Sequence, residues 1–581
     1  MKLLNGSIYS INAAALLIGA AGLLSRLMGV ARDRMLAGYF GASRELDIYY
    51  AAFQIPDFVF MLFLLGAASA AIIPVFVEIK ERFPEEAKIF IGELLGVFFV
   101  ISLIVGVVAV LLIPVLIPFI APGFSVSERA DAVMLTRIMM VSPILLGLSS
   151  IISAVIQCSR RFLAFAVAPI FYNLGIIVGI LVFLPWFGML GLGAGVVLGA
   201  ALHLLVQIPS FSSLGNLVSL TPLVKRYKAL CTTFFGIPIP YRISDPVARV
   251  LQLSFPRVIA SSLNQITFLI LVAFASTLAS GSISVLQFAY NLHFLPIGIF
   301  GVSFAVAAFP SLNEYFLRRD SEAFLATYYG TIRTICFWIL PLSVLFYVLR
   351  AQIVRIALGS GKFDWEDTML TAAVLGVMVV AILAESVIPL ILRVYYALGN
   401  TVKPLFINAA TSLVTVAGAV WFINVFKGVS GMVPHYAASF LRIGSLENIA
   451  ILGIGFALSF GGILNLVLLA VGVKKELSQK FGRFDREKFG YLWKDIGVMG
   501  VVSVLSGFVS FGALRVANLF VTLETFFGVF LQGGFSFIVG ALFYGVVLYV
   551  FHNREAQQLV ETFRRRIIKK ELLPEALDGT N

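Results

Sequence analysis

Four charged residues, Arg26, Arg32, Asp33 and Arg34, lie at the end of the first apolar run of the chain. Residues 11–24 before them carry no charge, so Arg26 falls where a membrane helix would still be surrounded by lipid or protein. An arginine at the bilayer centre costs about 2.5–3.5 kcal/mol on insertion scales, and such residues usually face a cavity or a partner. Guanidinium groups donate paired hydrogen bonds to phosphate or carboxylate. The cluster therefore indicates either an anion-binding site or internal neutralisation by nearby aspartates.

The spacing within this cluster bears on that choice. Arg26 and Asp33 share one face of a helix but lie two turns apart, about 10.5 Å along its axis. This is too far for a direct ion pair in a straight helix. Gly29 lies between them, and a bend or break there would turn several cationic groups toward one point. The alternative is that Asp33 and Asp47 neutralise Arg26 or Arg32, and at least one arginine is expected to be paired.

Further polar residues interrupt later apolar segments, and each has two interpretations. Asp57, directly after Pro56, is either a cavity residue or the cap of a kinked helix. Arg257, directly after Pro256, is either a cavity cation or an anchor at the inner membrane surface.

Four more such residues lie in other apolar segments of the chain. Glu385 is a candidate for ion coupling or one half of a buried pair. His293 is expected to be buried and hydrogen bonded. Asn173 and Asn408 are expected to tie neighbouring helices together, and Asn408 is also a candidate for ion coupling.

The composition identifies the environment of these residues. The 581 residues are 60% hydrophobic and 12% charged, whereas soluble domains carry about 25% charged residues. The chain is therefore an all-α polytopic membrane protein. The first apolar segment has no small-residue cleavage site and is interpreted as a retained helix. The glycines of residues 188–199 are expected to allow close helix packing.

Several function classes find no support in the sequence. The net charge of +12 is spread over loops between apolar segments, which fits membrane topology better than nucleic-acid binding. The three cysteines and four histidines have no metal-ligand or disulfide spacing. No Walker A sequence or nucleophile triad is present, so we expect no enzyme and no cofactor. Energy would come from H⁺ or Na⁺ coupling or from the membrane potential.

Fourteen apolar segments are long enough to cross a hydrocarbon core of about 30 Å. Their approximate limits are 10–38, 47–78, 88–120, 131–157, 163–186, 188–210, 250–280, 283–316, 325–349, 368–399, 403–426, 447–473, 492–517 and 526–551. Lys and Arg concentrate in alternate loops, and the positive-inside rule then places both termini in the cytoplasm.

A weak internal repeat divides these spans. Residues 169–173 resemble 404–408, and residues 50–56 resemble 290–296, at offsets of 235 and 240. Transporters built from such repeats bind substrate between the halves. The predicted domains are an N-lobe (1–210), a cytoplasmic linker (211–246), a C-lobe (247–475), two additional spans (476–551) and a cytoplasmic tail (552–581). A short surface helix is expected at Tyr436–Arg442.

An ordered set of motifs resembles the MurJ/MviN lipid II flippase family of the multidrug/oligosaccharidyl-lipid/polysaccharide exporter superfamily. The set covers about residues 10–475. Its members are Ser25–Asp33, Asp47 with Ala52, Phe53 and Pro56, Ala121–Phe124, Arg161 to Asn173, Ala279–Ser282, Gly361–Phe363 and Tyr396–Thr401 with Pro404.

The resemblance implies fourteen transmembrane helices, with two pseudo-symmetric six-helix lobes and a lipid-tail groove formed by the last two. It implies a bacterial cytoplasmic membrane protein that moves a lipid-linked cell-wall precursor by alternating access, among membrane lipids and wall-synthesis proteins. On the matching positions, Arg26 and Arg32 would hold the diphosphate. Asp33, Asp47 and Gly29 would gate or orient them.

The chain departs from the family pattern at several cavity positions. Family arginines of the second and eighth helices are replaced at Phe60-Met61 and at Tyr290-Asn291. The auxiliary cavity candidates are Arg34, Asp57, Arg257, His293 and Asn291. The departures keep two alternatives open: another polyprenyl-linked oligosaccharide as cargo, or a non-transporting scaffold for wall-synthesis proteins.

Overall fold

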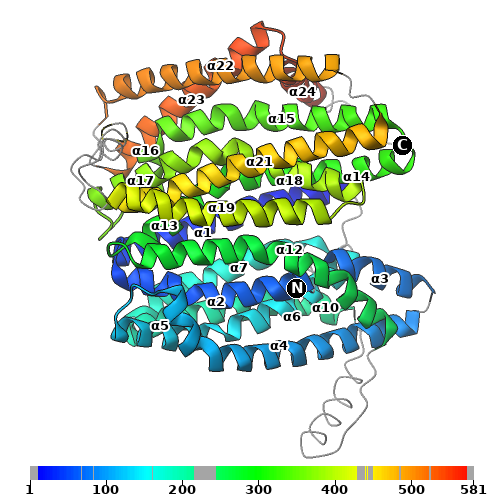
Figure 1. The fold of residues 1–581 in the computed structure, drawn as a ribbon, viewed down its shortest axis with the longest axis vertical. Helices are drawn as coiled ribbons and strands as arrows, with labels where there is room; N and C mark the ends of the chain where they lie inside the picture. The colour runs from blue at the N-terminus through cyan, green and yellow to red at the C-terminus, as the bar shows by residue number, and fades with distance from the viewer. Residues whose placement is uncertain are drawn as a thin grey trace, which may run out of the picture. The chain divides into compact units, whose positions relative to one another are not determined.

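The computed structural model describes residues 11–66, 69–82, 84–159, 161–214, 244–427, 439, 441, 449–482, 486–521 and 525–571. Across these ranges all regular secondary structure is helical (Figure 1), which confirms the predicted all-α class. Most of the predicted linker 211–246, most of the segment with the predicted helix Tyr436–Arg442, and the tail beyond Glu571 lie outside them.

Eleven helical stretches of the described residues are long and apolar enough to cross a membrane. They are Ile89–Ile120, Val126–Cys158, Phe162–Phe187, Met189–Ser212, Ser282–Leu317, Ser321–Val348, Trp365–Ala397, Val402–Lys427, Ile449–Phe481, Leu492–Ala517 and Phe526–Val550. The predicted multi-span membrane protein is therefore confirmed, while the count of fourteen stays a prediction.

The chain forms two compact units, which are described separately. Unit 1 comprises Met1–Gln287 and Ser360–Asp367, and unit 2 comprises Phe288–Gly359 and Thr368–Asn581. These units are defined by internal contacts. The predicted domains rest on the sequence repeat and stay predictions.

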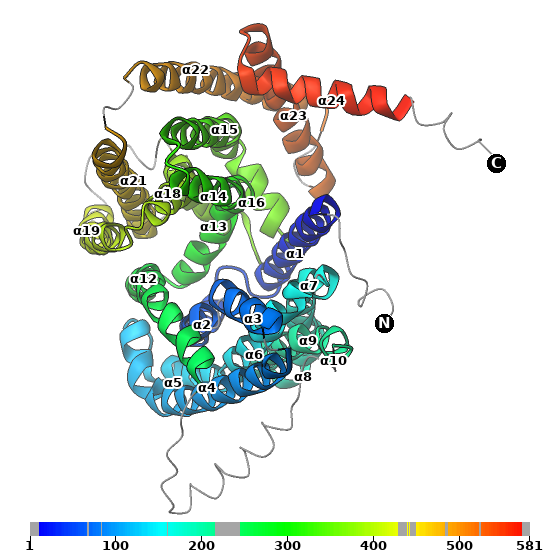
Figure 2. The same cartoon turned by 90° about the vertical axis from the view of Figure 1, so that its right-hand side faces the viewer.

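Unit 1 is a bundle in which α7 lies between α1 and α9 (Figure 2). Its helices are α1 (Ile11–Phe40), α2 (Arg44–Gly66), α3 (Ser69–Arg82), α4 (Pro84–Ile120), α5 (Val126–Met139), α6 (Val141–Cys158), α7 (Phe162–Val178), the π-helical turn η1 (Gly179–Phe183), α8 (Leu184–Phe187), α9 (Met189–Leu205), α10 (Ile208–Ser212) and α12 (Asp245–Ser276).

Glycines bring α7 and α9 close together. A Cβ on Gly175 would lie 2.2 Å from the Cα of Gly199, and a Cβ on Gly179 would lie 2.5 Å from the Cα of Gly195. Only glycine permits such backbone approach, so the predicted role of this glycine-rich segment is confirmed. This packing fixes α7 and α9 as one wall of the site described below.

The segment 360–367 completes unit 1 from a distant part of the sequence. The Ser360 hydroxyl donates to the carbonyl of Arg34 at 3.0 Å, and the Lys362 amide donates to the carbonyl of Gly38 at 2.9 Å. The Ala42 amide donates to Oδ2 of Asp367 at 3.0 Å. The carbonyl of Gly38 in the last turn of α1 and an amide in the turn into α2 thus find their partners in this segment.

Unit 2 is a second helical bundle, and its α13 and α17 begin on residues of unit 1. Its elements are α13 (Ser282–Pro296), the π-helical turn η3 (Ile297–Gly301), α14 (Val302–Leu317), α15 (Ser321–Val348), α16 (Arg350–Leu358), α17 (Trp365–Met378), the 3₁₀ turn η4 (Val379–Ala381), α18 (Ile382–Ala397), α19 (Val402–Lys427), the 3₁₀ turn η5 (Ile449–Ile451), α21 (Leu452–Phe481), α22 (Arg486–Ala517), α23 (Phe526–Val550) and α24 (Arg554–Glu571).

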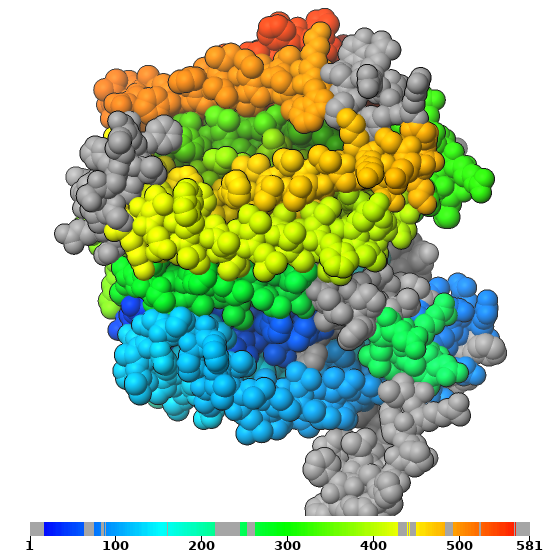
Figure 3. Space-filling view, in the orientation of Figure 1, coloured from blue at the N-terminus to red at the C-terminus, as the bar shows by residue number. Residues whose placement is uncertain are grey.

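Two closely packed groups of helices organise unit 2, the pair α19–α21 and the three helices α15, α22 and α23. The space-filling view shows α19 and α21 packed side by side along their lengths (Figure 3). On the other side, α22 packs against α15 and α23, with an apolar cluster that includes Phe337 and Tyr544. The Tyr544 hydroxyl donates to the carbonyl of Phe337 at 2.9 Å, so its polar end is satisfied inside this cluster.

Candidate functional site

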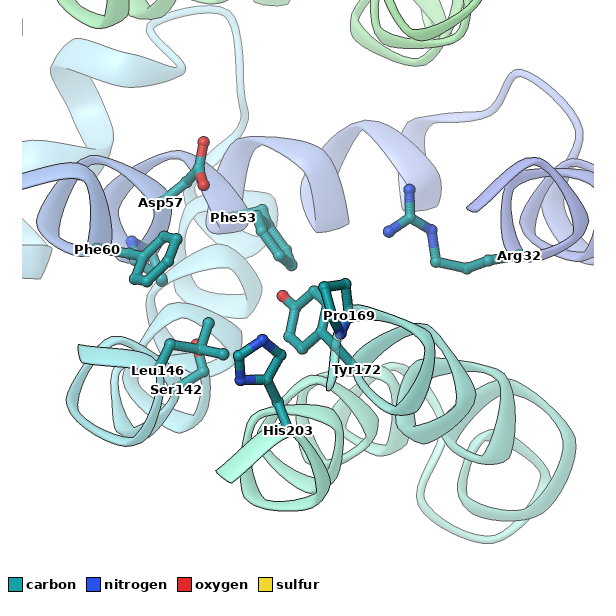
Figure 4. A pocket seen from close by; sticks show the side chains of 10 residues that line it. Arg32, Phe53, Asp57, Phe60, Ser142, Leu146, Pro169, Tyr172 and His203 are labelled. Atoms are coloured by element: carbon teal, nitrogen blue, oxygen red, sulfur yellow. The ribbon is translucent and has the colours of Figure 1, made fainter. Parts of the chain in front are cut away.

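A pocket of about 320 Å³ opens within unit 1 (Figure 4). Five helices supply its lining: α1, α2, α6, α7 and α9. The lining residues are Arg32, Phe53, Pro56, Asp57, Phe60, Ser142, Leu146, Pro169, Tyr172 and His203. Arg32 lies at one end of the pocket, and Asp57 and Phe60 lie at the other.

Arg32 is held by two partners. Its Nε and Nη2 donate to Oδ1 of Asp33 at 3.0 and 2.8 Å, and its Nη1 donates to Oδ1 of Asn173 at 3.2 Å. The side chain of Arg32 remains 21% exposed, whereas that of Asp33 is 7% exposed. The expectation that at least one arginine is internally paired is confirmed, and the partner is the adjacent aspartate. A polar ligand that enters the pocket would meet a guanidinium already oriented by fixed acceptors.

Asn173 joins α7 to α1, as predicted. Besides accepting from Arg32, its Nδ2 donates to the carbonyl of Ser25 at 3.3 Å and to the carbonyl of Pro169 at 3.1 Å. A Cβ on Gly29 would lie 3.9 Å from Oδ1 of Asn173. α1 continues through Gly29 as one helix, so the break considered for this position is not present.

The remaining lining combines aromatic surface with a few polar groups. The rings of Phe53, Phe60 and Tyr172 lie around the pocket together with the imidazole of His203 (Figure 4). Asp57 lines the pocket, and its Oδ2 accepts from Nε2 of Gln265 at 3.1 Å. Such a mixture of apolar walls and few polar groups is typical of small-molecule sites.

His203 was not singled out from the sequence, although it lines this pocket. Its Nδ1 lies 2.8 Å from the hydroxyl of Ser149. Nε2 of Gln207 donates to the same hydroxyl at 2.7 Å, and Ser153 donates to Oε1 of Gln207 at 2.7 Å. This chain of hydrogen bonds between α6 and the end of α9 fixes the imidazole. The available signal was the spacing of four residues between His203 and Gln207, which places both on one helix face.

The other predicted residues of the first helix lie outside this lining. Arg26 is half-buried on α1, six residues before Arg32 and therefore about 120° away around the helix. Arg34 is half-buried near the end of α1. The predicted roles of both residues stay predictions.

Asp47 forms a second polar centre in unit 1, the Asp47 clasp, made of Asp47, Arg44, Gly281 and Ser284. Oδ2 of Asp47 accepts from the amide of Gly281 at 2.8 Å, and Oδ1 accepts from the amide and the hydroxyl of Ser284, each at 2.8 Å. Nη1 of Arg44 lies 3.9 Å from Oδ2. The carboxylate of α2 thus caps the first amides of α13. Its neighbours differ from Arg26 and Arg32, with which pairing was considered.

The remaining candidates fall into three groups, the first two in unit 2 and the last in unit 1. His293 and Glu385 form a pair, with Nε2 and Oε2 3.1 Å apart. Asn291 is half-buried on α13, and Oδ1 of Asn408 is buried without a hydrogen-bond partner among the described residues, so the predicted tie is not seen at this atom. Arg257 lies on α12, but its side chain is outside the described set.

The many apolar helices and the mainly apolar pocket lined by five of them define a polytopic membrane protein. Residues 36–531 match the family model for lipid II flippase MurJ. The chain belongs to this family, so the resemblance carried by the motifs is confirmed.

Relatives and solved structures agree with this assignment. A probable lipid II flippase MurJ from Rhizobium tropici is 29% identical over 398 residues, which are 67% of this chain and 71% of the relative. One from Borreliella burgdorferi is 24% identical over 512 residues, 87% of this chain and 97% of the relative. A structure of lipid II flippase MurJ in an inward closed conformation shares the fold, with a TM-score of 0.67, 23% identity, and coverage of 93% of this chain and 100% of that one. A multidrug resistance MATE family transporter of the MOP superfamily, in an inward-facing conformation, shares it less closely, with a TM-score of 0.59, 14% identity and coverage of 78% and 95%.

Proposed function

We propose that this protein moves lipid II, the undecaprenyl-pyrophosphate-linked peptidoglycan precursor, from the inner to the outer leaflet of the bacterial cytoplasmic membrane. The observation that carries the proposal is the oriented guanidinium of Arg32 at one end of a pocket, in a chain that belongs to the MurJ family. A diphosphate presents the paired oxygen acceptors that a guanidinium prefers.

In this proposal Asp33 and the diphosphate compete for Arg32. Oδ1 of Asp33 occupies Nε and Nη2, the two donors that face one side of the guanidinium. Binding of the diphosphate replaces this contact, and its return helps to release the cargo. Arg26 supplies a second cation, while Asp33 and the Asp47 clasp orient and gate the site.

The wider arrangement is part of the same proposal. The chain crosses the membrane fourteen times with both termini in the cytoplasm. Movement of two six-helix lobes opens the binding site alternately to the two sides of the membrane. The last two spans, α22 and α23, accept the undecaprenyl tail. The membrane potential, H⁺ or Na⁺ supplies energy without a bound cofactor, and moving one charge is worth about 2.3 kcal/mol per 100 mV. Membrane lipids and wall-synthesis proteins are the expected partners.

The test uses cells depleted of their own lipid II flippase and dependent on this chain. Lipid II exposed on the outer leaflet is measured directly, together with growth and protein level. Arg32→Ala and Arg26→Ala are expected to abolish rescue, because the diphosphate loses its cations. Arg318→Ala is the matched control, since the side chain of Arg318 is 69% exposed and forms an ion pair with Glu314 at the surface.

Full rescue by both arginine variants would overturn the binding role. Movement of another polyprenyl-linked oligosaccharide, but not of lipid II, in purified vesicles would favour the alternative cargo. A scaffold role would follow if the two arginine variants supported growth while deletion of residues 552–581 stopped it.

A further inference from the structure

A histidine and a glutamate meet inside unit 2, on α13 and α18. The side chain of His293 is fully buried, whereas that of Glu385 is 25% exposed. Nε2 of His293 and Oε2 of Glu385 lie 3.1 Å apart. The carboxyl group therefore connects a buried imidazole to a more accessible space.

The pair is incompletely satisfied. Nδ1 of His293 is buried and has no hydrogen-bond partner among the described residues, and the same is true of the hydroxyl of Ser386, the residue after Glu385. Leaving buried polar atoms without a partner destabilises a fold, so such sites need an explanation. An Nδ1 without a partner fits a neutral imidazole whose proton is on Nε2. In that tautomer Nε2 donates a hydrogen bond to an ionised Glu385.

Both helices are irregular beside the pair. The π-helical turn η3 begins four residues after His293, and the 3₁₀ turn η4 ends four residues before Glu385. The π-helical turn η3 packs closely against α18 beside Glu385, because a Cβ on Gly301 would lie 2.6 Å from the Cα of Ser386. π-helical and 3₁₀ turns within longer helices often mark functional sites and hinges.

Other charged groups on the surrounding elements are engaged elsewhere. Arg393, two turns further along α18, donates to the carbonyl of Pro389. Arg333 on α15 bridges to Asp495 and Glu555, and Glu476 on α21 bridges to Lys403. Glu314 and Arg318, near the end of α14, pair with each other, and Tyr290 on α13 lies beside the imidazole with ring centroids 6.5 Å apart.

We propose that the His293–Glu385 pair is a proton-binding site whose occupancy is linked to the conformation of α13 and α18. The pair without the extra proton carries one negative charge. Uptake of one proton from water makes it neutral and places a hydrogen on Nδ1, where the present arrangement offers no acceptor. Protonation therefore favours a different arrangement of the two helices, as any ligand favours the state that binds it better.

This inference rests on the proposed function for its role in transport, where the proton would be the coupling ion. Proton binding by the pair and its effect on conformation can be tested without lipid II. Phe300 of η3 stacks on Trp338, with ring centroids 5.3 Å apart and planes at 17°. Trp338 fluorescence therefore reports on the irregular turn directly.

The first experiment follows tryptophan fluorescence against pH in the purified full-length protein, without lipid II. A sigmoidal change is expected, and Trp338→Phe removes it, which assigns the signal. His293→Gln and Glu385→Gln are expected to abolish the change, because each replaces one of the two ionisable groups that share the proton with an amide that cannot ionise, while keeping a hydrogen-bonding side chain. Glu385→Asp, which still titrates, is expected to keep the change with a shifted midpoint. Glu314→Gln on α14 is the matched control.

The second experiment measures lipid II movement in vesicles with an imposed pH gradient. With one proton per cycle, one pH unit changes the leaflet distribution by up to about tenfold. The two Gln variants are expected to lose this response. A wild type without a pH-dependent fluorescence change, or Gln variants that keep it, would overturn the proton site. If the fluorescence behaves as expected but lipid II does not move, the proposed function fails and the proton site stands.

Discussion

The two carboxylates Asp47 and Glu385 have very different surroundings in the two units. Asp47 is completely buried and accepts three hydrogen bonds of 2.8 Å from Gly281 and Ser284, with Arg44 nearby. The side chain of Glu385 is a quarter exposed and pairs with a histidine whose other nitrogen has no hydrogen-bond partner among the described residues.

The difference indicates different roles. The loss of a carboxylate surrounded by fixed donors leaves several of those donors unsatisfied. A partly exposed carboxylate with a single hydrogen-bonded partner can be altered at smaller cost to the fold. The Asp47 clasp should therefore matter mainly for stability, and the His293–Glu385 pair mainly for function.

The largest effect on stability is expected at Gly281. This residue has φ of +86°, and a Cβ would lie 2.0 Å from the carbonyl oxygen of Ala42. Backbone strain and overpacking each cost about 1–3 kcal/mol, so Gly281→Ala should lower the free energy of unfolding by about 3–5 kcal/mol. Chemical unfolding in bicelles measures this. Gly497→Ala is the control, because nothing lies within 4 Å of its added Cβ.

Removing the carboxylate itself should have the next largest effect. Asp47→Ala leaves the amides of Gly281 and Ser284 and the Ser284 hydroxyl without their acceptor, which should cost about 3 kcal/mol. Asp47→Asn keeps one acceptor oxygen, which can serve either Ser284 or Gly281, and its amino group then faces the donors of the other residue. This variant should lower the free energy of unfolding by about half as much as Asp47→Ala. Equal stability of Asp47→Ala and wild type would contradict the clasp.

An intermediate effect is expected at Asn173, which ties α7 to α1 and holds Arg32. Asn173→Ala removes these contacts and should cost about 1–2 kcal/mol, a usual size for interhelical hydrogen bonds in membranes. It should also slow lipid II movement less than Arg32→Ala does, since Asp33 still orients the guanidinium. Unfolding and transport are measured on the same preparations.

The smallest effect on stability is expected at Glu385. Glu385→Gln keeps a hydrogen bond to His293 and should change the free energy of unfolding by less than about 1 kcal/mol. A loss as large as that of Asp47→Ala would abolish the contrast between the two carboxylates and make the pair a structural element.

The sequence predicted the helices well because long apolar runs leave few alternatives in a membrane. The predicted span 526–551 corresponds to α23 (Phe526–Val550), and the predicted span 10–38 to α1 (Ile11–Phe40). The irregular turns η3 and η4 were not predicted, since one π-helical or 3₁₀ turn hardly disturbs an apolar pattern.

The site was predicted only where its partners are close in sequence or carry a motif. Asp33 beside Arg32 and the tie through Asn173 belong to this group. The partners of Asp47 lie more than 230 residues away, and His293 and Glu385 are 92 residues apart. Contacts at such separation are set by tertiary packing, which one sequence does not reveal. His203 was missed because a single histidine in an apolar segment carries no pattern.

The segment 360–367 has a consequence for how the protein is made. It belongs to unit 1 and donates hydrogen bonds to carbonyls near the end of the first helix. Residues 288–359, which belong to unit 2, precede it in the chain. During synthesis more than three hundred further residues must therefore be made before α1 can form its hydrogen bonds with Ser360 and Lys362. The N-terminal part cannot finish folding ahead of the rest, and a protein split into two coexpressed pieces should assemble most readily when the first piece extends past Asp367.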